Sequence, residues 1–132
     1  MAYWLFKQGP SSYSYTDLER DGSTTWDGVK NNLALKHLRS VRKGDKALFY
    51  HTGDEKQVVG IMEVSSDPYP DGKDKSLTVV DVRPSSRLTK PVTLQQFKGD
   101  PAFADWELVR ISRLSVMPVP PVLWQKIMKM AG

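Results

Sequence analysis

The chain has 132 residues, a length that fits one domain and can bury a core without disulfides or metals. It contains no cysteine, which excludes disulfides, thiol catalysis and cysteine-ligated zinc, and fits a reducing cytoplasm as the expected location. Its 19 basic and 15 acidic side chains give a net charge of +4, a mild excess that permits nucleic-acid contact without requiring it. No signal peptide and no apolar run of membrane-spanning length are visible, so no membrane partner is expected.

The first residues predict a strand followed by a helix. Tyr3–Phe6 is an apolar run that ends before a Gly-Pro pair, as expected of a buried strand. Thr16 and Glu19 have the spacing of a capping box, in which each side chain bonds the other residue's backbone N–H. Gly22 follows at a distance suited to ending a short helix.

A second helix and a strand hairpin are predicted next. Asn31 or Asn32 is positioned to cap a basic helix that carries an apolar stripe. After a Lys-Gly-Asp turn, Ala47–Tyr50 is apolar and aromatic, which is typical of a strand. A Gly-Asp pair then favours a hairpin into a second apolar strand, Val58–Val64.

The rest of the chain alternates between short strands and short helices. Asp67–Lys75 is rich in Asp, Pro and Gly, so we expect a surface loop ahead of a strand at Leu77–Val82. Thr93 opens a second capping-box pattern, Val109–Val116 should contain the last strand, and Pro120 and the proline after it open a C-terminal helix. No repeat or long linker interrupts this order. We therefore expect residues 1–132 to form a single α+β domain, with a curved mixed β-sheet or small β-barrel flanked by short helices.

Residues usual for catalysis are sparse. His37 and His51 are the only histidines, and they do not have metal-ligand spacing. The sequence has no nucleophile elbow, Walker loop or dinucleotide fingerprint. We therefore expect no catalytic residue, no metal and no cofactor. Glu63 is the one acidic residue inside an apolar strand, where it is either a general base or, by simple alternation, a solvent-facing side chain.

A more informative segment lies just ahead of the basic helix, where an indole, polar groups and a glycine occur together. Trp26 can offer a stacking face to a flipped nucleobase, and Asp27 and Asn31 can bond its edge. Tyr50 and His51, at the end of a strand, add a hydroxyl and an imidazole. Structural roles are open for the same residues: core for Trp26 and Tyr50, a helix cap for Asn31, and a hydrogen-bonded structural histidine for His51.

Positive charge is concentrated in one segment. Six basic residues crowd positions 30 to 46, with only Asp45 to offset them: Lys30, Lys36, Arg39, Arg42, Lys43 and Lys46. Such a segment is either a solvated helix face or a surface that contacts the phosphates of a nucleic acid. Lys7 and Arg113 are further candidates for phosphate contacts.

Motifs along essentially the whole chain resemble, in order, those of the EVE domain family. The first is similar to the family's opening Trp-x-x-Lys-x-x-Pro and reads Tyr3-Trp4-Leu5-Phe6-Lys7-Gln8-Gly9-Pro10. The others follow in the family's order: Tyr13-Ser14, Trp26-Asp27-Gly28-Val29-Lys30-Asn31, Phe49-Tyr50-His51, Val59-Gly60-Ile61, Tyr69-Pro70-Asp71 and Arg113-Leu114-Ser115-Val116-Met117-Pro118-Val119. No single motif is specific, but the ordered set is.

The resemblance implies a fold and a function that composition alone does not supply. The EVE family belongs to the PUA-like group and is similar to the YTH readers of methylated adenine in RNA. The resemblance therefore implies a non-catalytic module that recognises a modified, typically methylated, base of DNA or RNA in an aromatic pocket. The residues expected around this base are Trp26, Asp27, Asn31, Tyr50, His51, Tyr69 and Ser115. Those expected to meet phosphates are Lys7, Lys30, Arg39, Arg42, Lys43 and Arg113.

The sequence departs from the family pattern at several positions near the expected pocket. Gln8 and Gly9 replace a Ser-Glu pair, and Lys30 replaces an arginine, which keeps the charge but loses the planar guanidinium. Leu77 stands where a tryptophan is common in the family. We therefore expect Tyr69 to supply the second wall of the pocket.

Two alternatives to a base reader remain open. One is a small PUA-like enzyme acting on a modified nucleoside, with Glu63 and Lys7 as acid–base candidates. The other is a protein-interaction domain with a vestigial pocket. A buried carboxylate–lysine pair facing the pocket would favour the enzyme, and an aromatic pocket without such a pair would favour the reader.

Overall fold

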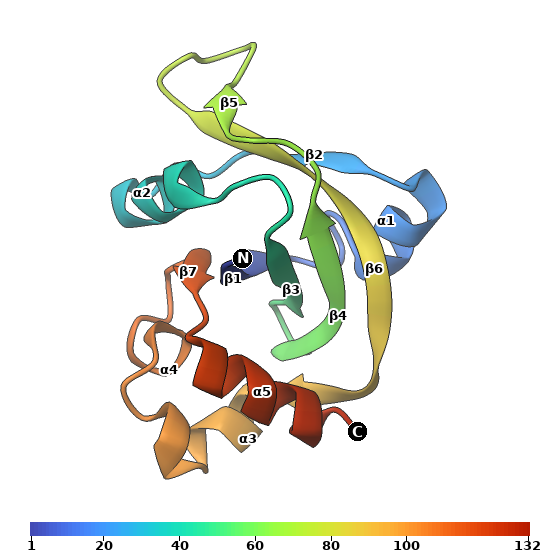
Figure 1. The fold of residues 1–132 in the computed structure, drawn as a ribbon, viewed down its shortest axis with the longest axis vertical. Coiled ribbons are helices and arrows are strands. Elements are labelled where there is room, and N and C mark those ends of the chain that lie inside the picture. Colours follow the sequence, from blue (N-terminus) through green and yellow to red (C-terminus); the bar gives the residue numbers. More distant parts are fainter.

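The computed structural model describes residues 1–132 as a curved, mixed β-sheet with short helices around it (Figure 1). The strands are β1 (Tyr3–Gln8), β2 (Thr24–Trp26), β3 (Lys46–His51), β4 (Gln57–Val64), β5 (Tyr69–Pro70), β6 (Thr78–Thr93) and β7 (Val116–Pro118). The helices are α1 (Tyr15–Asp21), α2 (Asn32–Ser40), α3 (Leu94–Lys98), the 3-10 helix η1 (Pro101–Phe103), α4 (Glu107–Arg110) and α5 (Pro121–Met130). This architecture confirms the α+β class and the curved mixed sheet.

The strand order is β2-β6-β4-β3-β1-β7, with β5 added to β6. Within it, β1 and β3 are parallel, from Tyr3 beside Lys46 to Gln8 beside His51, and all other pairs are antiparallel. The register between β4 and β6 shifts on either side of Gly60. Such irregularities bend strands, and Figure 1 shows β4 and β6 curving together along one side of the molecule.

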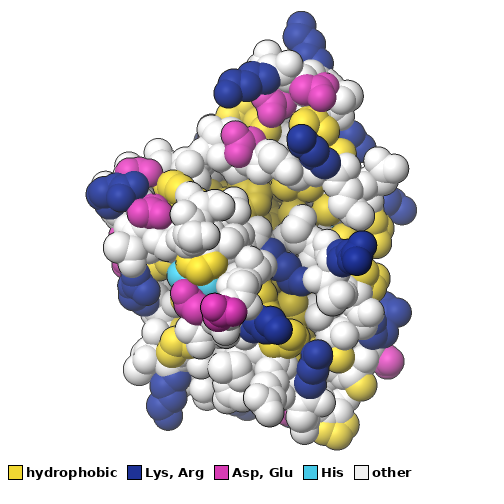
Figure 2. Space-filling model, turned by 180° about the vertical axis from the view of Figure 1, so that it is seen from behind, with side chains coloured by type: hydrophobic (Ala, Val, Ile, Leu, Met, Phe, Trp, Pro, Cys, Tyr) yellow, Lys and Arg dark blue, Asp and Glu magenta, His cyan; other side chains and the backbone are white.

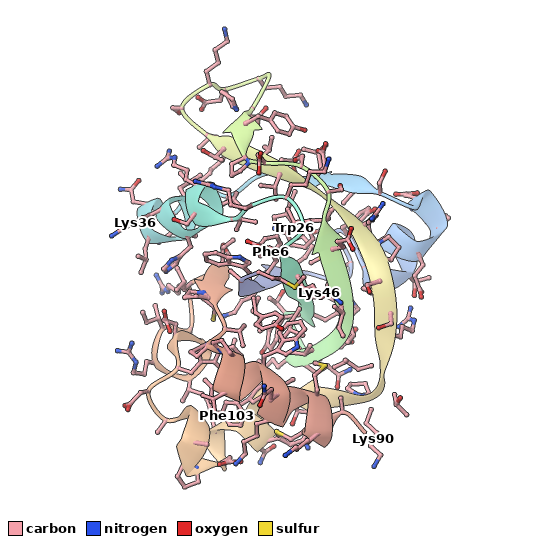
Figure 3. The ribbon with its side chains drawn as sticks, viewed as in Figure 1. Phe6, Trp26, Lys36, Lys46, Lys90 and Phe103 are labelled. Carbon is pink, nitrogen blue, oxygen red and sulfur yellow. The ribbon has the colours of Figure 1, made fainter.

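One continuous cluster of 34 buried residues forms the core. Aromatic rings from four elements meet in it: the Trp26 centroid lies 5.3 Å from that of Phe6 and 5.2 Å from that of Phe49, and Tyr15 lies 5.6 Å from Phe49. Figure 3 shows Phe6 and Trp26 together in the interior, whereas Lys36 and Lys90 project from the surface. These ring contacts tie β1, β2, β3 and α1 to one another.

A buried carboxylate organises the turn before β3. Asp45 is only 5% exposed and accepts hydrogen bonds from the Trp4 indole at 2.9 Å and from the backbone N–H groups of Ala2 and Arg42 at 3.0 and 2.9 Å. Three donors satisfy the carboxylate, which burial of a charge requires. The same bonds turn the only acidic side chain of the segment from 30 to 46 away from solvent.

Most predicted strands and caps are confirmed. The predicted strands at 3–6, 47–50 and 58–64 lie within β1, β3 and β4. Asn31 caps α2 by accepting the Ala34 N–H at 3.0 Å, and Gly22 ends α1 in the left-handed region with φ 77°. Thr93 forms the predicted capping box with Gln96.

The capping box predicted for α1 is wrong by two residues. Ser14 and Asp17 form the box instead, and the helix begins at Tyr15. Thr16 and Glu19 point to another element, since both accept hydrogen bonds from the Arg87 guanidinium of β6. Arg87, which is distant in the sequence, therefore binds the two side chains that the local pattern assigned to the helix cap.

Two strand predictions are also wrong in extent. The strand predicted within Val109–Val116 begins only at Val116. Helix α4 occupies the start of that range, and β7 runs over Val116–Pro118, where it pairs with β1. The strand predicted at Leu77–Val82 continues to Thr93. Its second half is largely exposed, so it has no apolar pattern, and backbone pairing with β4 defines it instead. The short strands β2 and β5 were not predicted.

Gly60 allows α1 to pack on β4. A Cβ at this position would lie 2.6 Å from the Tyr15 ring, which is buried there with its hydroxyl donating to the Ile61 carbonyl at 2.8 Å. The missing side chain of Gly60 is thus the space that the Tyr15 ring fills.

We predict that Gly60→Ala destabilises the fold, because the new methyl group overlaps a rigid buried ring. The free energy of unfolding should fall by about 1–3 kcal/mol in urea titrations. Gly72→Ala is the matched control, since a Cβ there meets nothing within 4 Å and Gly72 has no positive φ. Equal stability of the two variants would contradict this account of the α1–β4 contact.

Candidate nucleic-acid interface

A hollow of about 330 Å³ opens beside Trp26, where the end of β1, the approach to α1 and strand β2 meet. We call it the Trp26 hollow, and its lining residues are Gln8, Ser12, Tyr13, Thr24, Thr25, Trp26 and Asp27. Two aromatic rings and several hydrogen-bonding side chains therefore share one concave surface. Trp26 and Asp27 were predicted to lie together at a binding site, and this hollow contains both.

Trp26 presents only a small part of its surface to the hollow. The residue is 3% exposed, and Phe6 and Phe49 pack against its ring at 43° and 86°. Most of its surface thus belongs to the core, which was the alternative interpretation of this residue. The second ring of the hollow is Tyr13, which is half-buried and donates its hydroxyl to Asp21 at 2.9 Å. Burial, followed by this acidic neighbour, raises the pKa of Tyr13.

The hollow offers both a hydrogen-bond donor and a hydrogen-bond acceptor. The Gln8 carbonyl oxygen accepts the Gly9 N–H at 3.1 Å, which leaves the amide NH₂ as a donor. Asp27 is exposed and takes part in none of the protein's ion pairs, so its carboxylate can accept from an incoming group. The sequence marked Gln8 only as a departure from the family pattern, and neither Gln8 nor Tyr13 was among the predicted site residues.

His51 lies on the same face of the sheet as Gln8, its neighbour across the β1–β3 pair. Its Nε2 accepts the Tyr15 N–H at 3.1 Å, and its Nδ1 lies 2.9 Å from Glu55. Because Nε2 accepts, Nδ1 is the nitrogen that donates, and its hydrogen bond lowers the pKa of Glu55. Both nitrogens are therefore used within the protein, where they hold the start of α1 beside the Trp26 hollow.

Other predicted residues lie on the opposite face of the sheet. Side chains alternate along a strand, so Lys7 and its neighbour Tyr50 point away from the side of Gln8 and His51. Lys7 lies 5.5 Å above the Tyr50 ring, and its backbone N–H donates to the Ser115 carbonyl at 2.9 Å. The structure thus does not bring Tyr50 and Ser115 into the Trp26 hollow.

Tyr69 also lies outside the Trp26 hollow. It lines a separate groove together with Arg39, Arg42 and Lys75, and its hydroxyl donates to Asp81 at 2.6 Å. That hydrogen bond raises the pKa of Tyr69. Asn31 is exposed at the start of α2, where its oxygen serves the helix cap and its amide NH₂ remains a donor.

The basic residues predicted to meet phosphates are exposed, apart from the half-buried Lys7. Arg39 donates to the Thr78 hydroxyl at 3.1 Å and to the Ser76 carbonyl at 3.2 Å, which holds it against the start of β6. Arg42 donates only to backbone carbonyls at the end of α2. Lys30, Lys43 and Arg113 form none of the protein's ion pairs. The cationic groups of Lys30, Lys43 and Arg113 therefore remain available to an anionic partner.

The acid–base pair considered for an enzyme is not assembled. Glu63 is half-exposed and pairs with Arg83 of β6. Lys7 lies beside Tyr50, whereas Glu63 lies beside Lys46, at opposite ends of β3. Four residues of strand separate these positions by about 13 Å. The structure contains no group of three His, Asp or Glu side chains that could hold a metal, and no helix long and apolar enough to cross a membrane.

Known proteins share this fold along the whole chain. The NMR structure of a Rhodopseudomonas palustris protein matches with a TM-score of 0.94 and 40% identity, covering 100% of this chain and 94% of that one. Human THYN1 protein, solved in complex with 5-methylcytosine containing DNA, matches with a TM-score of 0.90 and 23% identity over 99% of this chain and 98% of that one.

Sequence comparison also identifies related proteins. Thymocyte nuclear protein 1 of Rattus norvegicus is 33% identical over 101 residues, which are 67% of this chain and 45% of that protein. The chain thus spans less than half the length of this relative. The model of the EVE domain family matches residues 2–130. Because that match covers nearly the whole chain and the curved sheet agrees with it, the chain belongs to the EVE domain family.

Proposed function

We propose that this chain is a non-catalytic module that binds nucleic acid carrying a modified base, and that the base enters the Trp26 hollow. One observation carries the proposal: the hollow combines two aromatic side chains with a free carboxylate and a free amide donor. Its volume of about 330 Å³ lies within the usual range of roughly 300–1,000 Å³ for small-ligand sites. The DNA complex of the human protein with the same fold supports a methylated base as the ligand.

The polar groups of the hollow match the edge of a cytosine. The exocyclic amine of that base donates, and its ring nitrogen and carbonyl accept. Asp27 supplies the acceptor for the amine, and the Gln8 amide supplies a donor for the ring nitrogen. Tyr13 and the small exposed part of Trp26 supply apolar contact for the ring and its methyl group. We therefore propose 5-methylcytosine as the base to test first.

Phosphates would be met by the exposed basic side chains outside the hollow. Figure 2 shows Lys and Arg side chains spread over one face of the molecule, some of them in and beside a hollowed region, with Asp and Glu side chains on the same face. Contacts of this kind fix the position of a strand, whereas contacts in the hollow select the base. The separation of Glu63 from Lys7 gives no support to the enzyme alternative.

We predict that the chain binds an oligonucleotide with one 5-methylcytosine about fourfold more tightly than its unmodified counterpart. This factor corresponds to burial of one methyl group, worth about 0.8 kcal/mol. Fluorescence anisotropy should be measured on matched single-stranded and duplex DNA and RNA, with methyladenine as a further arm. Equal dissociation constants for all modified and unmodified strands would refute a base reader.

We predict that Asp27→Ala weakens binding of the 5-methylcytosine oligonucleotide while the fold stays intact, because the exocyclic amine of the base loses its acceptor. Loss of a hydrogen bond to a charged group costs about 1.5 kcal/mol or more, about tenfold in affinity. Asp105→Ala is the control, since Asp105 is also exposed and lines none of the hollows. If both variants bind as the unchanged protein does, Asp27 has no part in recognition.

Trp26→Ala is expected to act mainly on stability. Removing a ring that packs between Phe6 and Phe49 should lower the free energy of unfolding by about 3–5 kcal/mol, measured by thermal and urea unfolding. A variant that unfolds like the unchanged protein but loses base preference would instead assign Trp26 chiefly to the binding surface.

The salt dependence of binding tests the basic segment. Replacing Arg42 and Lys43 with alanine should reduce the slope of log affinity against log salt by up to about 2 for duplex DNA, because fewer counterions are released. Lys90 and Lys129 replaced together form a control with the same change of charge on exposed residues outside this segment. A slope that changes equally in both double variants would reveal a general charge effect rather than a binding surface.

A further inference from the structure

A second cavity lies on the face of the β1–β3 pair that points away from the side chains of Gln8 and His51. It has a volume of about 230 Å³ and is formed by the end of β1, the β3–β4 hairpin, α3 and α4. We call it the Lys7 cavity. Its polar lining includes Lys7, Tyr50, Thr52, Lys56, Lys98 and Ser112, and its apolar lining includes Leu94, Leu108 and Val109. It shares no residue with the Trp26 hollow.

The charges in this cavity are all positive. Lys7, Lys56 and Lys98 line it, no carboxylate does, and none of the three lysines takes part in an ion pair. Two carboxylates, Asp54 and Glu55, line an adjoining hollow that shares Lys56 and Lys98 with this cavity. Three ammonium groups that form no ion pair repel one another around one cavity, so an anion bound between them would lower the electrostatic energy.

Lys7 is held in place rather than free in solvent. Its Nζ donates to the Ser112 carbonyl at 2.9 Å and lies 5.5 Å from the centroid of the Tyr50 ring. One of its three N–H donors is thus used, and two remain. Burial lowers the pKa of Lys7. A bound anion would offset this by favouring the charged ammonium.

Tyr50 adds a hydroxyl donor to the same cavity. Its residue is 3% exposed, and burial raises its pKa to about 12, so the hydroxyl remains protonated at neutral pH. No fully buried side-chain polar atom lacks a partner anywhere in the protein. The Tyr50 hydroxyl therefore opens into the Lys7 cavity, where it can donate to an oxygen of a ligand.

The backbone at Lys56 is also constrained. Its φ of 47° lies in the left-handed region, and it is the only residue other than glycine with a positive φ. Its carbonyl accepts the Leu94 N–H at 2.8 Å, which ties the β3–β4 hairpin to the start of α3. Strained backbone persists where surrounding contacts fix it, and it is frequent at ligand sites. Here the hydrogen bond from Leu94 fixes the backbone of Lys56, from which the side chain extends into the cavity.

We propose that the Lys7 cavity is a binding site for a phosphate group. The donors present are three ammonium groups and one phenol, and phosphate oxygens accept from both. The cavity is smaller than most small-ligand pockets, which suits a phosphate group with a short apolar neighbour against Leu94 and Val109. The phosphate belongs either to a nucleic-acid strand bound to the protein or to a free phosphorylated small molecule. The proposal does not depend on recognition of a modified base.

The test is an NMR titration of the isotope-labelled protein with inorganic phosphate, with sodium chloride at equal ionic strength as the reference. Backbone amides of Thr52, Gly53 and Val109 should shift in a saturable manner with phosphate and not with chloride. The double replacement of Lys56 and Lys98 by alanine should weaken the phosphate affinity about tenfold or more. Tyr50→Phe, which keeps the ring below Lys7, should weaken it by a smaller factor.

Replacement of Lys90 and Lys129 by alanine is the matched control, because it removes two charges away from the cavity and should leave phosphate binding unchanged. Shifts that do not saturate, that chloride reproduces, or that saturate at the same phosphate concentration in the Lys56 and Lys98 double variant would overturn the proposal. Addition of an unmodified oligonucleotide then identifies the source. Displacement of phosphate assigns the site to a strand, and simultaneous binding assigns it to a free phosphorylated molecule. Both results leave the phosphate site standing, and neither depends on a modified base.

Discussion

The parallel pairing of β1 with β3 is the constraint on which both candidate sites depend. It joins the N-terminal strand to a strand about 40 residues later, and it sets which side chains share a face. Phe6, Phe49 and His51 face α1 and β2, whereas Lys7 and Tyr50 face α3 and α4. A shift of one residue in this register would exchange the two faces and destroy the Trp26 hollow and the Lys7 cavity together.

The position of α1 connects the core to the Trp26 hollow. Its first residue is Tyr15, whose backbone N–H donates to His51. The Tyr15 ring fills the space above Gly60, and the Arg87 guanidinium lies 5.2 Å from the centroid of that ring. Tyr13, in the wall of the hollow, lies two residues earlier. The shape of the proposed base site is therefore set by buried contacts, as a pre-organised site requires.

The basic side chains are also divided between two environments, one exposed and one half-buried. Asp45 is buried and satisfied by three N–H donors, so the basic segment around it shows its cations to solvent without an acidic neighbour from the same segment. These cations lie on exposed side chains that can follow a flexible phosphate backbone. Lys7, by contrast, is half-buried and held by a carbonyl and a ring. The first arrangement suits adjustable contacts with a strand, and the second suits a single anion in a fixed place.

The sequence by itself determined the fold class, the central strands, most helix caps and the family, because apolar periodicity, capping residues and ordered motifs are local properties of a chain. It also predicted that Trp26 and Asp27 lie together, and both line the Trp26 hollow. Only the tertiary structure decided that Trp26 lies mostly in the core, that His51 serves α1, and that Tyr50 and Tyr69 lie away from the Trp26 hollow. The physical reason is that strand alternation and sheet register decide which face a side chain joins. Register is set by pairing between residues far apart in the chain, which no local pattern contains.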